Sequence, residues 1–593
     1  MAPSLTDLSP DLLTLICSHC SLGTSVNLAR TCRTLSEHAL KQVWHTLSSC
    51  SIIAYTLPRE LWDLGDLADK IEEVGFVPGT LSFTRSLNCS DLARFRKYAP
   101  YVRAVSHRAL QRAPFVLSAA AWHNLESILK LTSNCFPNLH TISKHDLAAP
   151  FVEPMYLFFS NSLRTFEYSY YFFHDWTGKN VSVPDPAARW TTALLATLPD
   201  YASNIRTFQT RLPRALSTRE LLSNVVEAMS CLVSFNMPSN YCPPAALVHL
   251  SKVPTLHILN VFLRYDDYSD DAMPLHVQAF PSLQTVIIEA DWTPTCVALL
   301  QQVRSPDMET LVLDVHAPMS VDDFHALATV LANCPSGRVL KCLTLRFGPR
   351  AIERVDPKPI PPDVFAILHG LHALREIRLE RGCYAALDDD ALVAALDAWP
   401  DIRVAELCSS ATLSFGASDA PRVTLLGLAA ITGRGLPIDA IQVPLVDINH
   451  SEVDELLTHR PPKLFEPVLD YVCEGLGLFR KSCSLKTLGV GSSSISEEDV
   501  AGVAAILSQW FPRLHRIQYL THFSPWAWED GLTSEGVPIS PEVEEMYGRW
   551  NRVGQLVEAF ALVREQEQMW PYVAGIDEAL REWVIVEHSD ALE

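Results

Sequence analysis

The chain has 593 residues, of which 48% are hydrophobic and 19% are charged, and its formal net charge is −21. This length is too great for one compact core, so we expect several domains or a repeat solenoid. The apolar content excludes a largely disordered chain, and the negative charge disfavours nucleic acid as a partner. No apolar run is long enough to span a bilayer, and no basic segment precedes the first apolar stretch. The 15 cysteines lack paired spacing, so we expect reduced thiols in a cytoplasmic or nuclear protein.

Residues 1–48 are predicted to form three short helices. Ser9-Pro10-Asp11 is a strong helix start, because Ser9 can cap the first turn and Pro10 suits its first position. Three helices of this size bury little surface on their own, so we expect their apolar side to contact a partner. Cys17 and Cys20 have no second cysteine pair at zinc-ligand spacing, so no metal is expected here.

The apolar residues of this segment follow an order that resembles F-box domains. It runs Leu8-Ser9-Pro10-Asp11-Leu12-Leu13-x-x-Ile16, then Leu28-Ala29-x-x-Cys32-Arg33, then Leu40-x-x-Val43-Trp44. The resemblance implies docking on the Skp adaptor of a cullin–RING ubiquitin ligase. The residues that would face the adaptor, or support that face, are Leu8, Pro10, Leu12, Leu13, Ile16, Leu28, Cys32, Leu40, Val43 and Trp44. The alternative is a helical cap on the repeats that follow.

Residues 49–135 are interpreted as a helical connector with a degenerate first repeat. Apolar and charged residues alternate at roughly helical spacing over 55–77, and a second helix is expected to begin at Ser90. Val102 and Val105 indicate a degenerate strand. A further helix is expected to bury a stripe that consists of Trp122, Leu125, Ile128 and Leu129.

Residues 136–523 repeat one pattern, apolar-x-x-apolar-x-apolar, which Leu283, Val286 and Ile288 show most clearly. Clear copies begin at Leu256, Met308, Leu340, Leu374, Leu485 and Leu514, and weaker ones at Leu139, Leu163, Ile205, Leu232, Ile402 and Ile438. Between residues 232 and 402 the spacing is 24 to 34 residues, whereas leucine-rich repeats have a period of about 20 to 29. The pattern therefore resembles an irregular leucine-rich-repeat solenoid, an α/β fold with a parallel sheet on one side and helices on the other. An all-helical solenoid is the alternative architecture.

The helices between these strands have recognisable starts. Ser320-x-x-Asp323 and Ser496-x-x-Asp499 fit the capping box, in which each side chain bonds the other residue's backbone. Ser217-x-x-Glu220 indicates a third start of the same kind. A strand followed by its own helix, and repeated, favours the strand–helix solenoid.

Strand alternation predicts which side chains face the open side of the sheet. One lane holds Asn260, Ile287, Val312, Thr344, Arg378 and Glu406, and the next holds Phe262, Glu289, Asp314, Arg346, Glu380 and Cys408. These two lanes mix charged and apolar side chains, which suits a protein partner better than a phosphate or a lipid. The candidate substrate-binding residues are Phe262, Glu289, Asp314, Arg346, Arg378 and Glu380.

Two insertions and the C-terminal segment complete the chain. The aromatic-rich stretch 166–176 indicates either an interface or packing against a neighbouring repeat. The acidic stretch 266–271 lacks the glycine and glutamate of a calcium loop, so a solvated loop is expected. Residues 524–593 are predicted to be an acidic helical cap, with a long helix from Pro541. Its apolar stripe is Val543, Tyr547, Trp550, Val557 and Phe560.

No motif for catalysis or cofactor binding is present in the sequence. Metalloprotease, hydrolase and phosphate-loop signatures are all missing, and Gly489-Val-Gly491 is explained by a repeat turn. We therefore expect a non-enzymatic protein without a cofactor or metal. The main hypothesis is a substrate-recognition subunit of a Skp–cullin–F-box ubiquitin ligase that also binds an unknown protein substrate. The alternative is a leucine-rich-repeat interaction scaffold or inhibitor without a ligase.

Overall fold

The structure is a computed structural model of the whole chain, and it divides into two compact units, Met1–Glu289 and Ala290–Glu593. The boundary falls inside a strand of the repeat region. Each unit is described separately below. The residues that the structure describes are 8–64, 79–107, 115–130, 135–147, 153–170, 185–212, 219–268, 279–348, 358–408, 423–432, 434, 436–443, 448, 450–458, 484–491, 493–519, 541–542, 544–564 and 566.

The main element of the fold is a 15-stranded sheet whose strands follow the order of the sequence. Every pair with a defined register in this sheet is parallel. The unit 1 strands are β1 (Thr46–Leu47), β4 (Ala104–His107), β6 (Thr141–Leu147), β7 (Thr165–Tyr170), β8 (Thr207–Arg211), β9 (Ser234–Tyr241), β10 (Ile258–Leu263) and β11 (Thr285–Ala290, which ends at the unit boundary). The unit 2 strands are β12 (Thr310–Val315), β13 (Cys342–Phe347), β15 (Glu376–Glu380), β17 (Val404–Glu406), β18 (Ala440–Gln442), β19 (Thr487–Gly491) and β20 (Arg516–Tyr519).

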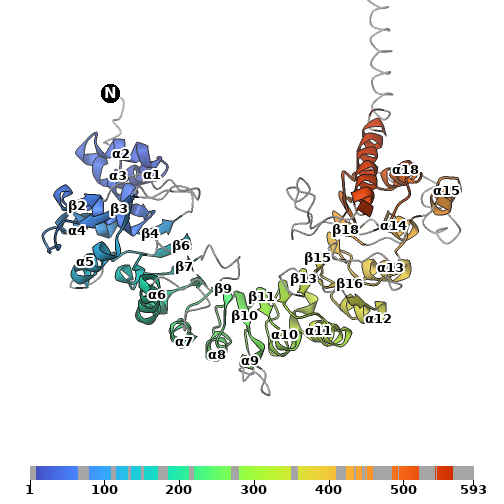
Figure 1. Cartoon of the computed structure of the whole chain (residues 1–593), viewed down its shortest axis with the longest axis horizontal. Helices are drawn as coiled ribbons and strands as arrows, with labels where there is room; N and C mark the ends of the chain where they lie inside the picture. Colours follow the sequence, from blue (N-terminus) through green and yellow to red (C-terminus); the bar gives the residue numbers. More distant parts are fainter. Residues whose placement is uncertain are drawn as a thin grey trace, which may run out of the picture. The chain divides into compact units, whose positions relative to one another are not determined.

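Helices connect these strands and, in each unit, cover one face of the sheet (Figure 1). In unit 1 they are α6 (Asp185–Thr197), α7 (Arg219–Glu227), α8 (Pro244–Leu250) and α9 (Tyr265–Tyr268). In unit 2 they are α10 (Thr293–Leu300), α11 (Val321–Asn333), α12 (Pro362–Phe365), α13 (Asp389–Ala398), α14 (Leu425–Thr432), α15 (His450–Thr458) and α18 (Val500–Trp510). A parallel sheet with helical crossovers confirms the α/β repeat solenoid and excludes the all-helical alternative.

The repeated apolar pattern forms the core between the sheet and the helices. Leu283, Val286 and Ile288 have no exposed surface, and the corresponding residues of the other copies are also buried, with Ile517 as a half-buried exception. Each repeat buries its apolar strand residues against its own helix and against the neighbouring repeats. The repeats therefore stabilise one another.

The helix starts agree with the expected caps in part. At α11 the Ser320 side chain and Asp323 form the reciprocal capping box. The Ser496 hydroxyl donates to the Asp499 carboxylate at 2.5 Å. However, α18 begins at Val500, and its N-cap residue is Asp499 rather than Ser496. Ser217 lies outside the described residues.

The first part of unit 1 contains the three predicted short helices, α1 (Pro10–Ser18), α2 (Leu22–Ala29) and α3 (Arg33–His45). The connector differs from the predicted helix over 55–77. It has 3-10 turns, η2 (Cys50–Thr56) and η3 (Arg59–Leu61), and then strand β2 (Trp62–Leu64); residues 65–78 lie outside the described part. Strand β2 pairs with β3 (Gly79–Phe83), which pairs with β5 (Phe115–Leu117), to form a second, three-stranded sheet.

Two other parts of the connector agree with the sequence. The degenerate strand is β4, with Val102 and Val105 buried, and the expected helix stripe is the buried side of α5 (Ala119–Leu129). The helix expected to begin at Ser90 is α4 (Ala93–Tyr98), which is followed by the 3-10 turn η4 (Ala99–Tyr101), and both precede β4.

The C-terminal part of unit 2 contains a helix across the described residues from 541 to 566. Trp550 is buried and donates its indole N–H to the carbonyl of Ser493 at 2.8 Å. Val553 and Val557 are also buried. This helix therefore packs on the end of the repeats, as a cap should; Val543 and residues 567–593 lie outside the described part.

Candidate functional site

The N-terminal helices expose an unusual amount of apolar surface. Ser9 caps α1 by accepting the backbone N–H of Leu12, and Ser21 caps α2 by accepting that of Thr24. The helices that follow leave five large apolar side chains substantially exposed: Leu12 (48%), Leu15 (55%), Ile16 (38%), Leu22 (64%) and Val26 (39%). We call these five residues the apolar cluster. Large exposed apolar groups concentrated in one short segment are typical of protein-binding surfaces.

The ten residues expected to face or support an adaptor lie at different depths. Pro10, Leu12, Ile16 and Cys32 are exposed, whereas Leu8, Leu28, Leu40, Val43 and Trp44 are half-buried. Leu13 is only 2% exposed, so it supports the helices from inside. The sequence pattern did not single out Leu15, Leu22 or Val26, which are exposed members of the apolar cluster.

Trp44 is held against the connector. Its ring stacks on that of Tyr98, with the centroids 4.9 Å apart and the planes at 3°. Because Tyr98 ends α4, this contact fixes the end of α3 relative to the connector. Trp44 thus has a structural partner within the chain.

A buried carboxylate joins the segment after α3 to the repeat sheet. Glu153 accepts hydrogen bonds from the Ser49 hydroxyl at 2.5 Å, from the Cys50 amide at 3.2 Å and from the Ser51 amide at 3.1 Å. It also pairs with the ammonium of Lys144 in β6. Both charged side chains are almost fully buried. This cluster has no local signal in the sequence, because the segment 49–51 lies about 100 residues before the Glu153 that it contacts.

The strand face of unit 2 brings together several predicted substrate-binding residues. The registers place Asp314 opposite Arg346, and Arg346 opposite Glu380, on β12, β13 and β15. Arg346 donates to Glu380 at 2.6 Å, and Arg378 donates to Glu406 at 2.6 Å. These half-buried arginines are therefore already neutralised by carboxylates on the neighbouring strand.

Three of the predicted substrate-binding residues lie below the accessible surface. Phe262, Glu289 and Asp314 are 1%, 4% and 7% exposed. Phe262 follows a register shift in β10 and packs its ring 4.4 Å from that of Tyr241. Asp314 accepts from Arg381 at 2.6 Å. On the strand face of unit 2 a ligand would instead meet Arg346, Arg378 and Glu380, together with Val312, Thr344 and Glu406 of the first lane, all of which are half-buried. In unit 1 the first-lane residues Asn260 and Ile287 are also half-buried.

The described part of the two insertions is occupied by internal contacts. Phe166 stacks between Tyr168 and Phe208 in the core, and residues 171–176 lie outside the described part. Asp267 accepts from Arg219 at 2.8 Å, and Asp266 from Arg264 at 2.8 Å. Within the described residues, no three His, Cys, Asp or Glu side chains form a group that could hold a metal ion.

Buried thiols are not available as nucleophiles. Burial raises the pKa of Cys50, Cys242 and Cys296 to about 12 in each case. A thiol reacts as its thiolate, so these side chains remain protonated and inert at neutral pH. Among the described helices, none combines the length and apolar character that a bilayer crossing requires.

Comparison with known proteins identifies no family. No family model matches the sequence, and no curated protein matches it. Among solved structures, human 5T4 (trophoblast glycoprotein) is 18% identical, with a TM-score of 0.21, over 30% of this chain and 62% of that chain. TLR13 in complex with ssRNA13 is 9% identical, with a TM-score of 0.26, over 72% of this chain and 60% of that chain.

The chain thus spans less than two thirds of either solved chain. Similarity at these TM-scores is too low to support an argument about fold or function. The repeat architecture therefore rests on the strand order, the registers and the buried apolar pattern.

Proposed function

We propose that the chain is a non-catalytic protein-interaction scaffold in which the N-terminal helices dock one partner protein and the repeats present a second binding surface. The apolar cluster on α1 and α2 is the observation that carries this proposal. Full burial of an exposed apolar side chain of this size contributes roughly 1.5 to 3 kcal/mol, and these five are 38% to 64% exposed, so each would contribute about half of that before the costs of association. Five such groups on two neighbouring helices offer a partner protein an apolar surface to cover.

The joint between the helices and the sheet supports a scaffold role. The stack of Trp44 on Tyr98 and the bonds of Glu153 to the segment 49–51 fix α3 relative to the repeats of unit 1. A docked partner would therefore be held at a defined distance from the repeats. Holding two proteins together raises their effective concentration without any bond chemistry by the scaffold.

A more specific proposal is that the docked partner is the Skp adaptor of a cullin–RING ubiquitin ligase. Its support is the F-box-like order of residues from Leu8 to Trp44, four of which are exposed. In this version the repeats would bind a protein substrate for ubiquitin transfer. The scaffold without a ligase needs only the exposed apolar cluster and the repeats.

Calorimetry with purified Skp adaptor distinguishes the two versions. Leu12→Asp/Ile16→Asp places two carboxylates in the apolar cluster without changing a buried residue. The matched control is Leu457→Asp/Leu562→Asp, which changes two leucines that are 51% and 59% exposed in unit 2. Leu13 is unsuitable, because a charge at this buried position would unfold the helices.

Adaptor binding by the intact chain and by the control, but not by Leu12→Asp/Ile16→Asp, supports the ligase subunit. Absence of adaptor binding by the intact chain removes the ligase version. The scaffold is then tested by crosslinking mass spectrometry of the full chain in cell extract. Crosslinks to one partner at residues 8–32, abolished by Leu12→Asp/Ile16→Asp, support it; crosslinks indifferent to that variant contradict docking at the apolar cluster.

A further inference from the structure

A row of basic residues begins the first strands of unit 1. The residue immediately before the strand is His45 at β1, Arg103 at β4, His140 at β6, Arg164 at β7 and Arg206 at β8. We call these five residues the basic row. Neighbouring strands in a sheet lie about 4.8 Å apart, so the whole row spans only about 20 Å.

Backbone hydrogen bonds set the spacing of the row. The amide of Arg103 donates to the carbonyl of His45 at 2.9 Å, and that of His140 to Arg103 at 2.8 Å. The amide of Arg164 donates to His140 at 2.8 Å, and that of Arg206 to Arg164 at 2.7 Å. The five positions are therefore fixed by the sheet rather than by a loop.

The arginines of the basic row are not paired with a carboxylate in the part of the chain that the structure describes. Among the residues that the structure describes, none forms a salt bridge with Arg103, Arg164 or Arg206. Arg164 and Arg206 are exposed, and Arg103 is half-buried. This local excess of positive charge contrasts with the net charge of −21 for the chain.

Four of the corresponding positions in unit 2 carry charges that pair with one another. Glu309 precedes β12 and pairs with Lys341, which precedes β13, at 2.5 Å. Asp439 precedes β18 and pairs with Lys486, which precedes β19, at 2.7 Å. The charges are balanced at these two pairs of strands, whereas Arg375 before β15 and Arg403 before β17 are exposed basic residues like those of unit 1. The basic row differs from them in the recess that opens beside it.

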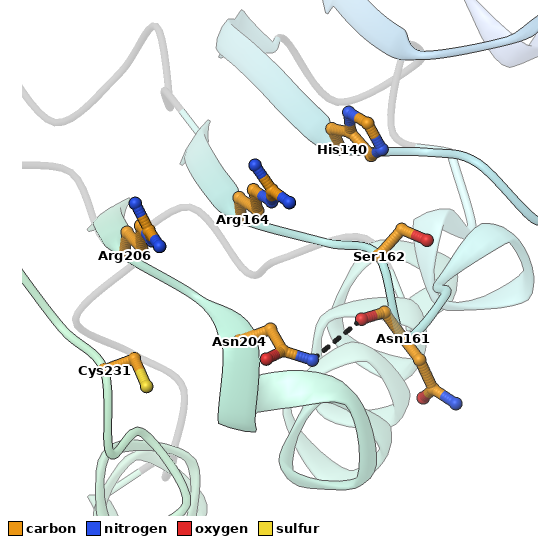
Figure 2. A pocket seen from close by; sticks show the side chains of 7 residues that line it. All are labelled: His140, Asn161, Ser162, Arg164, Asn204, Arg206 and Cys231. Atoms are coloured by element: carbon orange, nitrogen blue, oxygen red, sulfur yellow. Dashed lines mark hydrogen bonds between the residues drawn. The ribbon is translucent and has the colours of Figure 1, made fainter.

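A recess of about 320 Å³ opens at the basic row. Figure 2 shows His140, Arg164 and Arg206 side by side at the starts of their strands, with Asn161 and Asn204 from the preceding turns beside them. The Asn204 amide donates to the carbonyl of Asn161 at 3.0 Å, which holds the two turns together. None of the seven lining residues is an aspartate or a glutamate.

The surroundings of the histidines also reflect this excess of positive charge. Burial, together with Arg103 and Arg164, lowers the pKa of His140. Burial and Arg103 lower the pKa of His45. Protonation of either ring adds a charge to a site that is already cationic, and a bound anion would relieve this repulsion.

We propose that the basic row binds an acidic segment of a partner protein, with its carboxylates bound by Arg164 and Arg206 at the recess and by Arg103 beside it. A guanidinium can bind a carboxylate through two parallel hydrogen bonds. Alternate side chains of an extended peptide lie about 6.7 Å apart, so several carboxylates can reach the closely spaced cations. A long nucleic acid is disfavoured, because the remainder of the chain is strongly acidic.

This inference goes beyond the proposed docking of α1 and α2, because it concerns different residues and a different chemistry. A partner could be held by the apolar cluster, by the basic row, or by both. The two sites can therefore be tested separately in the same full-length chain.

The test is fluorescence anisotropy at low ionic strength with a labelled peptide of about eight residues, alternating glutamate and glycine. The comparison peptide has glutamine for glutamate. Arg164→Gln/Arg206→Gln should weaken binding of the acidic peptide at least about tenfold, since two charge-assisted contacts are lost. Both side chains are exposed, so the thermal unfolding midpoint of this variant should match that of the parent chain.

Arg375→Gln/Arg403→Gln is the matched control. These exposed arginines precede β15 and β17 on neighbouring strands of unit 2, so the control removes the same charge from the same position of the repeat. It should change affinity by less than about twofold, and Leu12→Asp/Ile16→Asp should leave peptide binding intact.

Three results would overturn the proposal. They are an absence of saturable binding to the acidic peptide, an equal affinity for the glutamine peptide, and an equal loss in the Arg375→Gln/Arg403→Gln control. Tighter binding of a short RNA with the same dependence on Arg164 and Arg206 would replace the protein partner by a nucleic acid. None of these results depends on whether the apolar cluster docks an adaptor.

Discussion

Lys144 and Glu153 form an ion pair that is almost fully buried inside unit 1. The carboxylate also accepts hydrogen bonds from Ser49, Cys50 and Ser51. Glu153 therefore links strand β6 of the repeats to the chain that leaves α3. A buried charge is tolerated only when such partners replace its lost hydration.

Replacing Glu153 by alanine should destabilise this joint by about 3 to 5 kcal/mol, because Lys144 would remain buried without a counter-charge. Hydrogen exchange of the full chain should become faster in residues 46–56, which lose their carboxylate acceptor. Lys144→Met/Glu153→Leu should recover most of the loss, since an apolar pair removes the buried charge. Equal protection in Glu153→Ala and the parent chain would contradict a structural role for the pair.

The stack of Trp44 on Tyr98 should show a measurable coupling energy. Stacked aromatic pairs contribute roughly 0.5 to 1.5 kcal/mol beyond the area that they bury. A double-mutant cycle with Trp44→Ala and Tyr98→Ala, measured by urea unfolding, should give a coupling in this range. Additive effects of the two substitutions would show that the rings do not stabilise one another.

Gly427→Ala should destabilise unit 2 by roughly 1 to 3 kcal/mol through overpacking. A Cβ at this position would lie only 2.1 Å from Oδ1 of Asp389. That carboxylate cannot move freely, because it accepts from the amide and the hydroxyl of Thr424, each at 2.8 Å. Thermal unfolding measures the change, and Gly23→Ala, where an added Cβ meets no atom within 4 Å, is the matched control. Equal midpoints for the two variants would contradict the close contact.

His140 should titrate below the ordinary pKa of histidine, because burial and the neighbouring Arg103 and Arg164 disfavour its protonated form. The folded state binds this proton less readily than the unfolded state does. The resulting stability is complete above the ordinary histidine pKa, about 6.5, and is lost as the pH falls through the folded value.

Carbon-13 labelling of histidine, with the resonance assigned by His140→Asn, measures this pKa directly. Adding the acidic peptide should raise it, because bound carboxylates offset the positive charge of the basic row. A midpoint above that of free histidine without the peptide would contradict the cationic surroundings.

The repeat core could be predicted from the sequence because its information is local. Val286 and Ile288 alternate within β11, Leu283 precedes it at a fixed distance, and the same spacing recurs in the clear copies, so the pattern places these residues inside. The capping box at Ser320 and Asp323 is local in the same sense. The prediction of a helix over 55–77 was wrong because the structure of this segment depends on contacts that are not local. Strands β2, β3 and β5 have only three to five residues each, and their pairing joins segments that are distant in sequence.

The burial of two predicted substrate-binding residues could not be predicted, because it depends on contacts between distant segments. Phe262 is buried after a register shift that pairs it with Tyr241. Asp314 accepts a hydrogen bond from Arg381, which lies 67 residues further along the chain. The exposed members of the apolar cluster, Leu15 and Leu22, likewise became evident only when the three helices were packed together.

The residue immediately before each strand lies outside the apolar pattern that holds the repeats together. A substitution at this position does not change the buried apolar residues of the repeat. The surface charge can therefore differ from strand to strand within the same fold. Unit 1 carries a basic residue at this place before five successive strands, and unit 2 carries both acidic and basic residues there. A substitution at this position can therefore alter which ligands the surface attracts without altering the buried residues that stabilise the repeats.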